Sequence, residues 1–152
     1  MTDVRLRDVI ADDLPVFFEH QQDPDATRMA GFVARDHEAF MTHWTTRVLG
    51  DETAVKQTVL VDDRVAGNLV CWVSGGERLV GYWIGREFWG RGVATTALRR
   101  FAELVPERPL RAHVVVSNIG SIRVLEKCGF VLVGRETTDV EELVYELQDR
   151  VG

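Results

Sequence analysis

Cysteine is scarce in this chain, and several features that would define a class of protein are missing. Cys71 and Cys128 are the two cysteines among 152 residues. Two cysteines are too few for a disulfide framework, so we expect both to be buried and reduced. Neither the cysteines nor the four histidines show a C-x-x-C or H-x-x-x-H spacing. We therefore expect no metal site.

Long apolar runs are also absent. The most apolar stretch, residues 69–73, is far shorter than the roughly 20 residues that a membrane-spanning helix needs, so we expect no membrane partner. The first seven residues have no apolar run of the kind found in signal peptides, and we expect a cytoplasmic location. No repeat, low-complexity tract or linker interrupts the chain. Its length suits one domain, which we assign to residues 1–152.

Charge is unevenly distributed along the chain. The net charge of -6 argues against a nucleic-acid partner. Between Arg86 and Lys127, however, eight basic residues face four acidic ones, so this segment carries +4 and the remainder -10. A basic segment on an acidic chain suits a small polyanionic ligand, and it leaves acidic groups for a cationic substrate.

Hydrophobic periodicity divides the chain into strands and helices. We expect strands at residues 4–7, 57–61, 65–73, 80–84, 110–116, 130–134 and 140–147. We expect helices at residues 12–22, 36–48, from a glycine turn near 92 to about 105, and 118–127. The sequence Asp23-Pro24-Asp25 should break the first helix, and we expect loops from about residue 20 to 35. This mixture indicates an α/β fold with hairpins rather than a uniform βαβ repeat.

The most informative stretch reads Y-W-I-G-R-E-F-W-G-R-G-V-A-T-T, from Tyr82 to Thr96. A short apolar strand leads into a glycine-rich turn, and apolar residues then recur on one helix face at Ala94, Leu98, Phe101 and Val105. Glycine lets the backbone come close to a ligand. The first N–H groups of a helix have no intrahelical acceptor and carry partial positive charge. The turn therefore predicts a phosphate-binding site.

Two familiar phosphate-binding motifs do not fit this turn. A Walker loop ends in G-K-[S/T], which the residues Gly92-Val93-Ala94 do not provide. A dinucleotide-binding G-x-G-x-x-G needs a third glycine at position 95, which is Thr95, and it belongs near the start of a parallel unit.

A second motif, N-I-G-S-I-R-V-L-E-K-C-G-F, occupies residues 118–130 directly after a predicted strand. Alone it predicts a helix with Ser117 or Asn118 as its N-cap and Gly129 as its end. Together with the first motif, about 28 residues earlier, it closely resembles the GCN5-related N-acetyltransferase (GNAT) superfamily. More narrowly, it resembles the branch that acetylates the N-termini of ribosomal proteins. The resemblance covers essentially the whole chain. It implies one domain with a mixed central sheet of about six or seven strands, about four helices on both faces, and splayed strands beside the cofactor.

The resemblance implies acetyl-CoA as co-substrate and an amine as acceptor. The family motif [Q/R]-x-x-G-x-[G/A] maps onto Trp89, Gly90, Arg91, Gly92, Val93 and Ala94. Trp89 replaces Gln or Arg, as is common in this branch. The pyrophosphate is expected on the N–H groups from Arg91 to Thr95, and the pantetheine arm along the backbone of Trp83 and Ile84. Asn118 resembles the residue that contacts this arm, and Arg123 could reach an adenosine phosphate or lie exposed to solvent.

The implied reaction is direct attack of a neutral amine on a thioester, with a backbone N–H near Ile84 stabilising the oxyanion. Many family members carry a tyrosine, as acid for the leaving thiolate, where this chain has Leu125. Ser121 resembles the substitute found in the ribosomal branch, or is a small residue that lets the cofactor approach. Glu141 or Glu142 is the candidate base, although either could be a surface acid. Glu77, just before the cofactor strand, is a competitor for this role.

The resemblance therefore implies an acetyl-CoA-dependent N-acetyltransferase that acts on a peptide or protein N-terminal amine, or on a small-molecule amine. Two alternatives remain: a catalytically idle acyl-CoA-binding sensor, and a transferase for another acyl-CoA. Homodimers are common in the family, so a homodimer is an open expectation. We also hypothesise that Trp44 or Trp72 lines the acceptor cleft.

Overall fold

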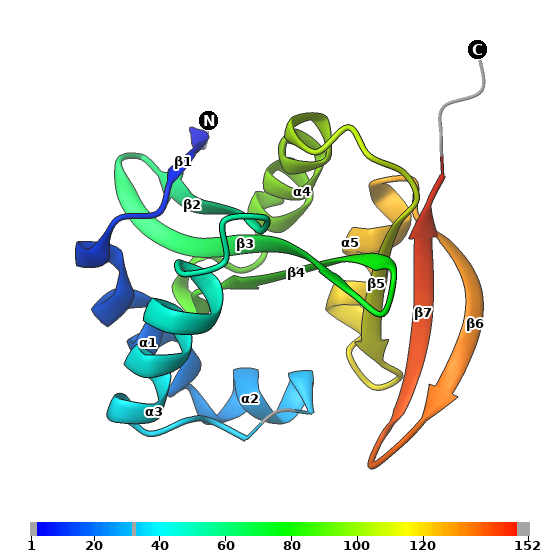
Figure 1. The fold of residues 1–152 in the computed structure, drawn as a ribbon, viewed down its shortest axis with the longest axis horizontal. Helices are drawn as coiled ribbons and strands as arrows, with labels where there is room; N and C mark the ends of the chain where they lie inside the picture. Colours follow the sequence, from blue (N-terminus) through cyan, green and yellow to red (C-terminus); the bar gives the residue numbers. More distant parts are fainter. Residues whose placement is uncertain (1–2, 32, 149–152) are drawn as a thin grey trace.

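The structure is a computed structural model that describes residues 3–31 and 33–148 (Figure 1). Its strands form one mixed sheet in the order β1-β2-β3-β4-β5-β7-β6. They are β1 (Val4–Asp8), β2 (Val55–Val61), β3 (Arg64–Ser74), β4 (Glu77–Ile84), β5 (Leu110–Val115), β6 (Val131–Thr137) and β7 (Glu141–Leu147). Each predicted strand is present, and the ends differ by a few residues.

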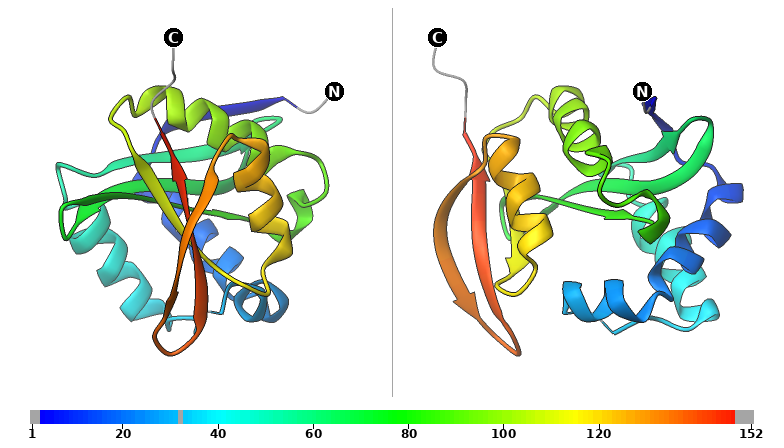
Figure 2. Two further views of the ribbon diagram at one scale, coloured as in Figure 1. Left: turned by 90° about the vertical axis from the view of Figure 1, so that its right-hand side faces the viewer. Right: turned by 180° about the vertical axis from the view of Figure 1, so that it is seen from behind.

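Helices cover both faces of this sheet (Figure 2). They are α1 (Leu14–Gln21), α2 (Pro24–Ala30), α3 (His37–Thr42), α4 (Val93–Leu104) and α5 (Ile119–Lys127). Three short segments complete them: η1 (Ala11–Asp13), η3 (Arg86–Phe88) and the π-helical η2 (His43–Val48). The predicted mixed sheet with helices on two faces is confirmed. None of the helices in the described residues is long and apolar enough to cross a membrane.

Two apolar cores hold the helices against the sheet. α4 buries Ala97, Leu98 and Phe101 completely, on the face that the predicted periodicity assigned to the core. On the opposite face, Phe17 of α1 and Trp44 of η2 pack with ring centroids 5.0 Å apart. These cores fix the positions of the helix ends that surround the site.

β4 and β5 are parallel neighbours that diverge along the chain (Figure 1). In the described residues they pair only through Arg78 with Leu110 and Leu79 with Arg111. β5 continues instead as the antiparallel partner of β7, from Leu110 to Val115. The predicted splayed strands are therefore confirmed, and β4 presents an edge beyond Leu79.

The segment expected to be loops, residues 20–35, contains the helix α2. Asp23 is its N-cap, because its carboxylate accepts from the N–H groups of Asp25 and Ala26. Pro24 is in the first turn, where its missing N–H leaves no hydrogen bond unmade. The break after α1 was correct, but the same residues start a second helix. The described chain thus has five α-helices instead of about four.

The predicted helix at residues 36–48 forms, but its second half, η2, is a π-helix instead of an α-helix. Leu49 N–H donates to the Trp44 carbonyl, five residues earlier, at 2.7 Å, which is the π-helical pattern. Trp44 is 3% exposed and belongs to the apolar core. Trp72 lies against Gly81 on the neighbouring strand. The hypothesis that one of these two indoles lines the acceptor cleft stays a prediction.

Candidate functional site

A cleft of about 470 Å³ opens beside the β4 edge, where the first turns of α4 and α5 meet, and α2 contributes a further wall. Its lining includes most of the residues predicted for cofactor binding: Trp83, Ile84, Trp89, Gly90, Gly92, Val93, Ala94, Thr95, Asn118 and Arg123. Ser121, predicted as catalytic, also lines it. Two strand–turn–helix units far apart in sequence thus form one cavity.

Two predicted residues have side chains outside this lining. Arg91 lies in the glycine turn, with its guanidinium 5.9 Å from the centre of the Phe88 ring. Glu141, the first candidate base, begins β7 and pairs with Arg135 at 2.6 Å. Its carbonyl accepts from Val116 N–H, so Glu141 lies beside the end of β5. Its role as a base stays a prediction.

The other two candidate bases, Glu77 and Glu142, also lie outside the lining of the cleft. Glu77 pairs with Arg111 at 2.8 Å. Glu142 pairs in the sheet with Val115 of β5 and does not line the cleft.

The glycine turn has the geometry of an anion cradle. Gly90 and Gly92 have φ values of +78° and +72°, a left-handed conformation that glycine adopts without strain. A Cβ built on either glycine would meet no protein atom within 4 Å, so the space beside the turn is open. Gly92 is the N-cap of α4 and provides no side-chain hydrogen bond. The first N–H groups of α4 can therefore bind a phosphate, and the site fits the anionic part of acetyl-CoA.

The start of α5 is held differently. Asn118, one of the two predicted candidates, is its N-cap, and its side-chain oxygen accepts from Ser121 N–H at 3.2 Å. This bond fixes Ser121 in the first turn. Further along α5, Arg123 and Lys127 also line the cleft. They add positive charge for a polyanionic ligand.

The backbone of β4 offers alternate groups to the cleft. Gly85 N–H donates to the Ala66 carbonyl on β3 at 2.8 Å. Because the groups of an antiparallel strand point alternately to its two sides, those of Trp83 face β3. Those of Tyr82 and Ile84 face the opposite side, where β5 has diverged. An amide-bearing arm would thus pair with Tyr82 and Ile84 rather than with Trp83.

Trp89 fastens the glycine turn to this strand. Its indole N–H donates to the Ile84 carbonyl at 2.9 Å. This contact gives the tryptophan of the W-G-R-G motif a structural role beside the cofactor site. It also occupies one of the groups that β4 presents to the cleft, and it leaves the Ile84 N–H for a ligand.

Tyr82 is a site residue that the sequence reasoning missed. It lines the cleft, and its hydroxyl donates to Ser121 Oγ at 2.9 Å. Burial raises the pKa of Tyr82 to about 12, so the phenol is neutral at physiological pH. The available signal was weak: a tyrosine one residue before the predicted pantetheine-binding pair.

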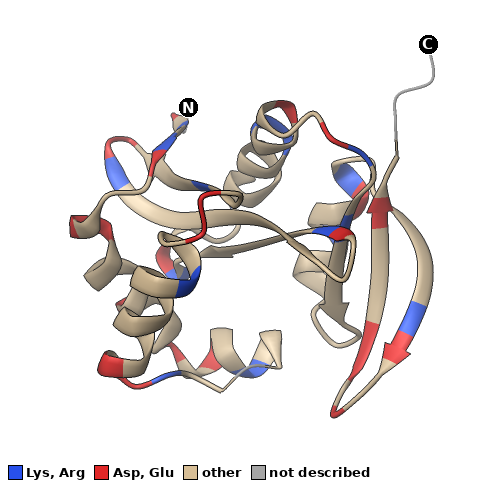
Figure 3. Ribbon diagram, in the orientation of Figure 1, with Lys and Arg blue, Asp and Glu red and all other residues tan. Residues whose placement is uncertain are grey.

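Negative charge is missing from this cleft. Among the described residues that line it, none is an aspartate, a glutamate or a histidine. Acidic residues gather instead at sites such as the β6–β7 hairpin (Figure 3). The described residues also contain no group of three or more His, Cys, Asp or Glu that could hold a metal ion.

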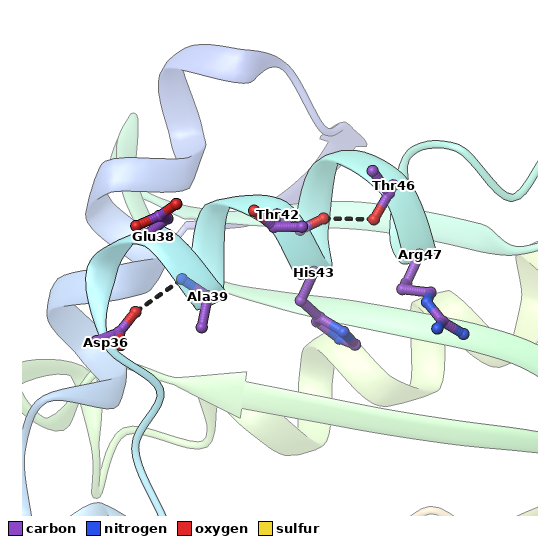
Figure 4. A pocket seen from close by; sticks show the side chains of 7 residues that line it. All are labelled: Asp36, Glu38, Ala39, Thr42, His43, Thr46 and Arg47. Atoms are coloured by element: carbon purple, nitrogen blue, oxygen red, sulfur yellow. Dashed lines mark hydrogen bonds between the residues drawn. The ribbon is translucent and has the colours of Figure 1, made fainter.

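A second hollow lies on the outer side of α3 and η2 (Figure 4). The side chains of His43 and Arg47 contribute to its lining. Asp36 caps α3, because its carboxylate accepts from Ala39 N–H at 2.8 Å. Burial, together with the charges of Arg35 and Arg47, lowers the pKa of His43. This open surface has no contact with the predicted motifs.

Comparisons with known proteins agree with this geometry. The sequence model for the acetyltransferase (GNAT) domain matches residues 3–131. An aminoglycoside acetyltransferase, AAC(6')-Ib, solved with coenzyme A, superposes with a TM-score of 0.84 at 19% identity, covering 96% of this chain and 95% of that one. A spermidine N-acetyltransferase from Vibrio cholerae, solved with CoA and spermine, has a TM-score of 0.80 at 15% identity, with 95% of each chain covered. A GNAT-family acetyltransferase from Bacillus anthracis has a TM-score of 0.79 at 17% identity, covering 95% and 94%. A comparison with curated protein sequences gives no significant match.

The chain therefore belongs to the GNAT acetyltransferase family. This family uses acetyl-CoA as its co-substrate, and the enzyme class is that of the acetyl-CoA-dependent N-acetyltransferases, as the motifs predicted. The narrower resemblance to the ribosomal-protein branch is not confirmed, because the similar structures named above carry other descriptions. At these identities the structures establish the shared fold.

Proposed function

We propose that this protein transfers the acetyl group of acetyl-CoA to a primary amine of low pKa, and that the α-amine of a peptide or protein is the favoured acceptor. Acetyl-CoA supplies an acetyl group activated as a thioester. The residues of the chain bind the anionic part of the cofactor at the glycine turn and at Arg123. They align its amide-bearing arm along Tyr82 and Ile84.

The observation that carries this proposal is the absence of a carboxylate or imidazole among the described cleft residues. If no side-chain base contacts the acceptor, the amine must arrive neutral. An α-amine with a pKa near 8 is about one-tenth neutral at pH 7, whereas a lysine amine with a pKa near 10.4 is neutral about once in a few thousand molecules. The cleft therefore favours acceptors that lose their proton in water.

Backbone groups and Ser121 take the remaining roles. The N–H groups of Tyr82 and Ile84 face the cleft, which supports the predicted backbone donor for charge developing on the acetyl oxygen. Ser121 lines the same cavity, and its hydroxyl would donate a hydrogen bond to the sulfur of the cofactor. Glu141 stays a candidate base, but its carboxylate pairs with Arg135 and it lies outside the cleft lining.

The test is acetylation of a matched peptide pair. One peptide has a free N-terminus and an internal lysine, and its control is the same peptide with the N-terminus blocked. We expect release of free CoA thiol and a mass gain of one acetyl group with the first peptide, and a rate at least tenfold lower with the second. Equal rates would contradict the preference for the α-amine.

Further acceptors and donors separate the alternatives. An aminoglycoside and spermidine belong in the panel, because similar structures carry those names. A rate with either that greatly exceeds the peptide rate would replace the peptide as the acceptor class. Tight CoA binding without release for any amine would favour an idle acyl-CoA sensor. Faster turnover with propionyl- or succinyl-CoA would favour another acyl donor.

A further inference from the structure

We propose that Tyr82 is a positioning residue, which holds the Ser121 hydroxyl so that its proton points to the sulfur of bound coenzyme A. This inference rests on the proposed function, because it concerns the leaving group of the same reaction. Leucine stands at position 125, where the family resemblance implies a tyrosine. The structure brings a different tyrosine, from β4, to the cavity.

The two hydroxyls are within hydrogen-bond distance, and we take Tyr82 as the donor. Tyr82 Oη donates to Ser121 Oγ at 2.9 Å, between residues 39 positions apart in sequence. A serine hydroxyl has one proton and two acceptor positions. When its oxygen accepts from the phenol, its own proton remains to be donated elsewhere. Asn118 fixes the backbone N–H of Ser121, so the hydroxyl can turn while its Cβ stays in place.

The position along the cleft points to the sulfur rather than to the phosphates. The glycine turn is tied to the Ile84 carbonyl by Trp89. Tyr82 lies two residues nearer the β4–β5 junction, about 7 Å along the strand. A ligand that places phosphates on the glycine turn therefore extends its far end toward Tyr82 and Ser121.

The pKa values of the phenol and the thiol show whether Tyr82 would donate a hydrogen bond or transfer its proton. The phenol of Tyr82 has a pKa of about 12, while a free thiol has a pKa of roughly 8.5. Proton transfer from the phenol to a thiolate is thus unfavourable by more than a thousandfold. Ser121 and Tyr82 keep their protons, and the pair stabilises negative charge on sulfur as a hydrogen-bond donor.

The experiment measures the binding of coenzyme A and not the rate of acetyl transfer. Dissociation constants of CoA and of desulfo-CoA, which lacks the sulfur, are determined by calorimetry between pH 6.5 and 9.5. Arg123, Lys127 and Cys128 are the titratable groups near this pair. Their effect on the part that the two ligands share is the same, so the ratio of the two constants reports the interactions of the thiol.

In the wild type we expect CoA to gain about tenfold or more in affinity over desulfo-CoA as pH rises through the thiol pKa, because a hydrogen bond to a charged acceptor is strong. Ser121→Ala and Tyr82→Phe should each lose most of this gain. The double variant should lose no more than Ser121→Ala, since Tyr82 acts through Ser121.

Tyr145→Phe is the matched control. Tyr145 is the second tyrosine of the chain. Its hydroxyl also bonds to α5, at Glu126 Oε2 and 3.3 Å, but it does not line the cleft. This variant should keep the full gain. A wild-type ratio that does not change with pH, or a Tyr82→Phe variant that keeps the gain, would overturn the inference. Failure to bind either ligand would instead overturn the proposed function.

Discussion

Asp13 is the most deeply buried carboxylate among the described residues, with 2% of its surface exposed. Arg7 binds it with two hydrogen bonds of 2.7 and 2.8 Å, and Thr58 donates a third at 2.6 Å. Burial alone would raise the pKa of Asp13, but these bonds and the charge of Arg7 hold it below its usual value. The group therefore joins β1, β2 and the start of α1.

We expect Asp13→Asn to lower the free energy of unfolding by about 1–3 kcal/mol at pH 7, because Arg7 loses a charged partner. A depressed carboxylate pKa contributes stability above the unfolded value, near 3.9, and that stability is lost as pH falls through the folded value. The gap between the wild type and the variant should thus begin to narrow below about pH 4 and should close only below the depressed folded pKa of Asp13. Urea denaturation at pH 7 and pH 3 measures the gap, with Asp12→Asn, an exposed neighbour, as control. A gap that is constant with pH would contradict the account.

At the scale of elements, the N-termini of α4 and α5 differ in what they can offer a ligand. α4 begins at Gly92, which offers no capping side chain, and leaves its first N–H groups for an anion. α5 begins at Asn118, whose side chain caps it. Because α5 has its own cap, the charge it brings to the cleft is that of its later side chains, including Arg123.

Arg123→Ala should weaken binding of CoA by about tenfold or more, in line with the loss of one hydrogen bond to a charged group, worth about 1.5–3 kcal/mol. If Arg123 meets the adenosine 3′-phosphate, binding of dephospho-CoA should not change. Calorimetry with both ligands distinguishes the cases. Arg47→Ala, in the separate hollow beside α3, is the matched control and should bind both ligands as the wild type does. An unchanged CoA affinity in Arg123→Ala would leave Arg123 as a surface residue.

At the scale of the whole molecule, charge is segregated around the cleft. The basic residues Arg123 and Lys127 line the cleft, while carboxylates such as Glu77 and Glu141 pair with arginines outside the cleft lining. The cavity can therefore hold a polyanion at one end without placing a fixed negative charge beside the acceptor amine. The acceptor's own ionisation should then control the rate.

We expect kcat/KM for the acceptor to rise about tenfold per pH unit and to level off at the pKa of the acceptor amine, because the neutral fraction follows that pKa. Two peptides whose α-amines differ in pKa should level off at different pH values. Initial rates from pH 6 to 10 provide the measurement. A plateau at one pH for both acceptors would reveal a base in the protein. In that case Glu141→Gln should remove the plateau, if Glu141 is that base.

Much of the fold could be predicted from short-range patterns. The turn glycines, the Asn118 cap and the apolar spacing of α4 express local rules of backbone geometry and helix periodicity, which act over a few residues. They correctly indicated the strands and the starts of α4 and α5. The splayed pair was implied by the family resemblance, and the cofactor-binding residues stay a prediction. The Asp23-Pro24 break was ambiguous, because the same residues that end one helix can cap the next.

The sequence by itself located the two motifs assigned to the cofactor. Which side chains contact the candidate catalytic residues was decided only by the packing of the tertiary structure. Tyr82 of β4 meets Ser121 of α5 although 39 residues separate them in the chain. Glu141 meets Arg135 across a hairpin, and the divergence of β5 turns the Tyr82 and Ile84 backbone toward the cleft. Contacts of this kind depend on how whole elements bury their apolar faces against each other, and no short stretch of residues encodes that arrangement.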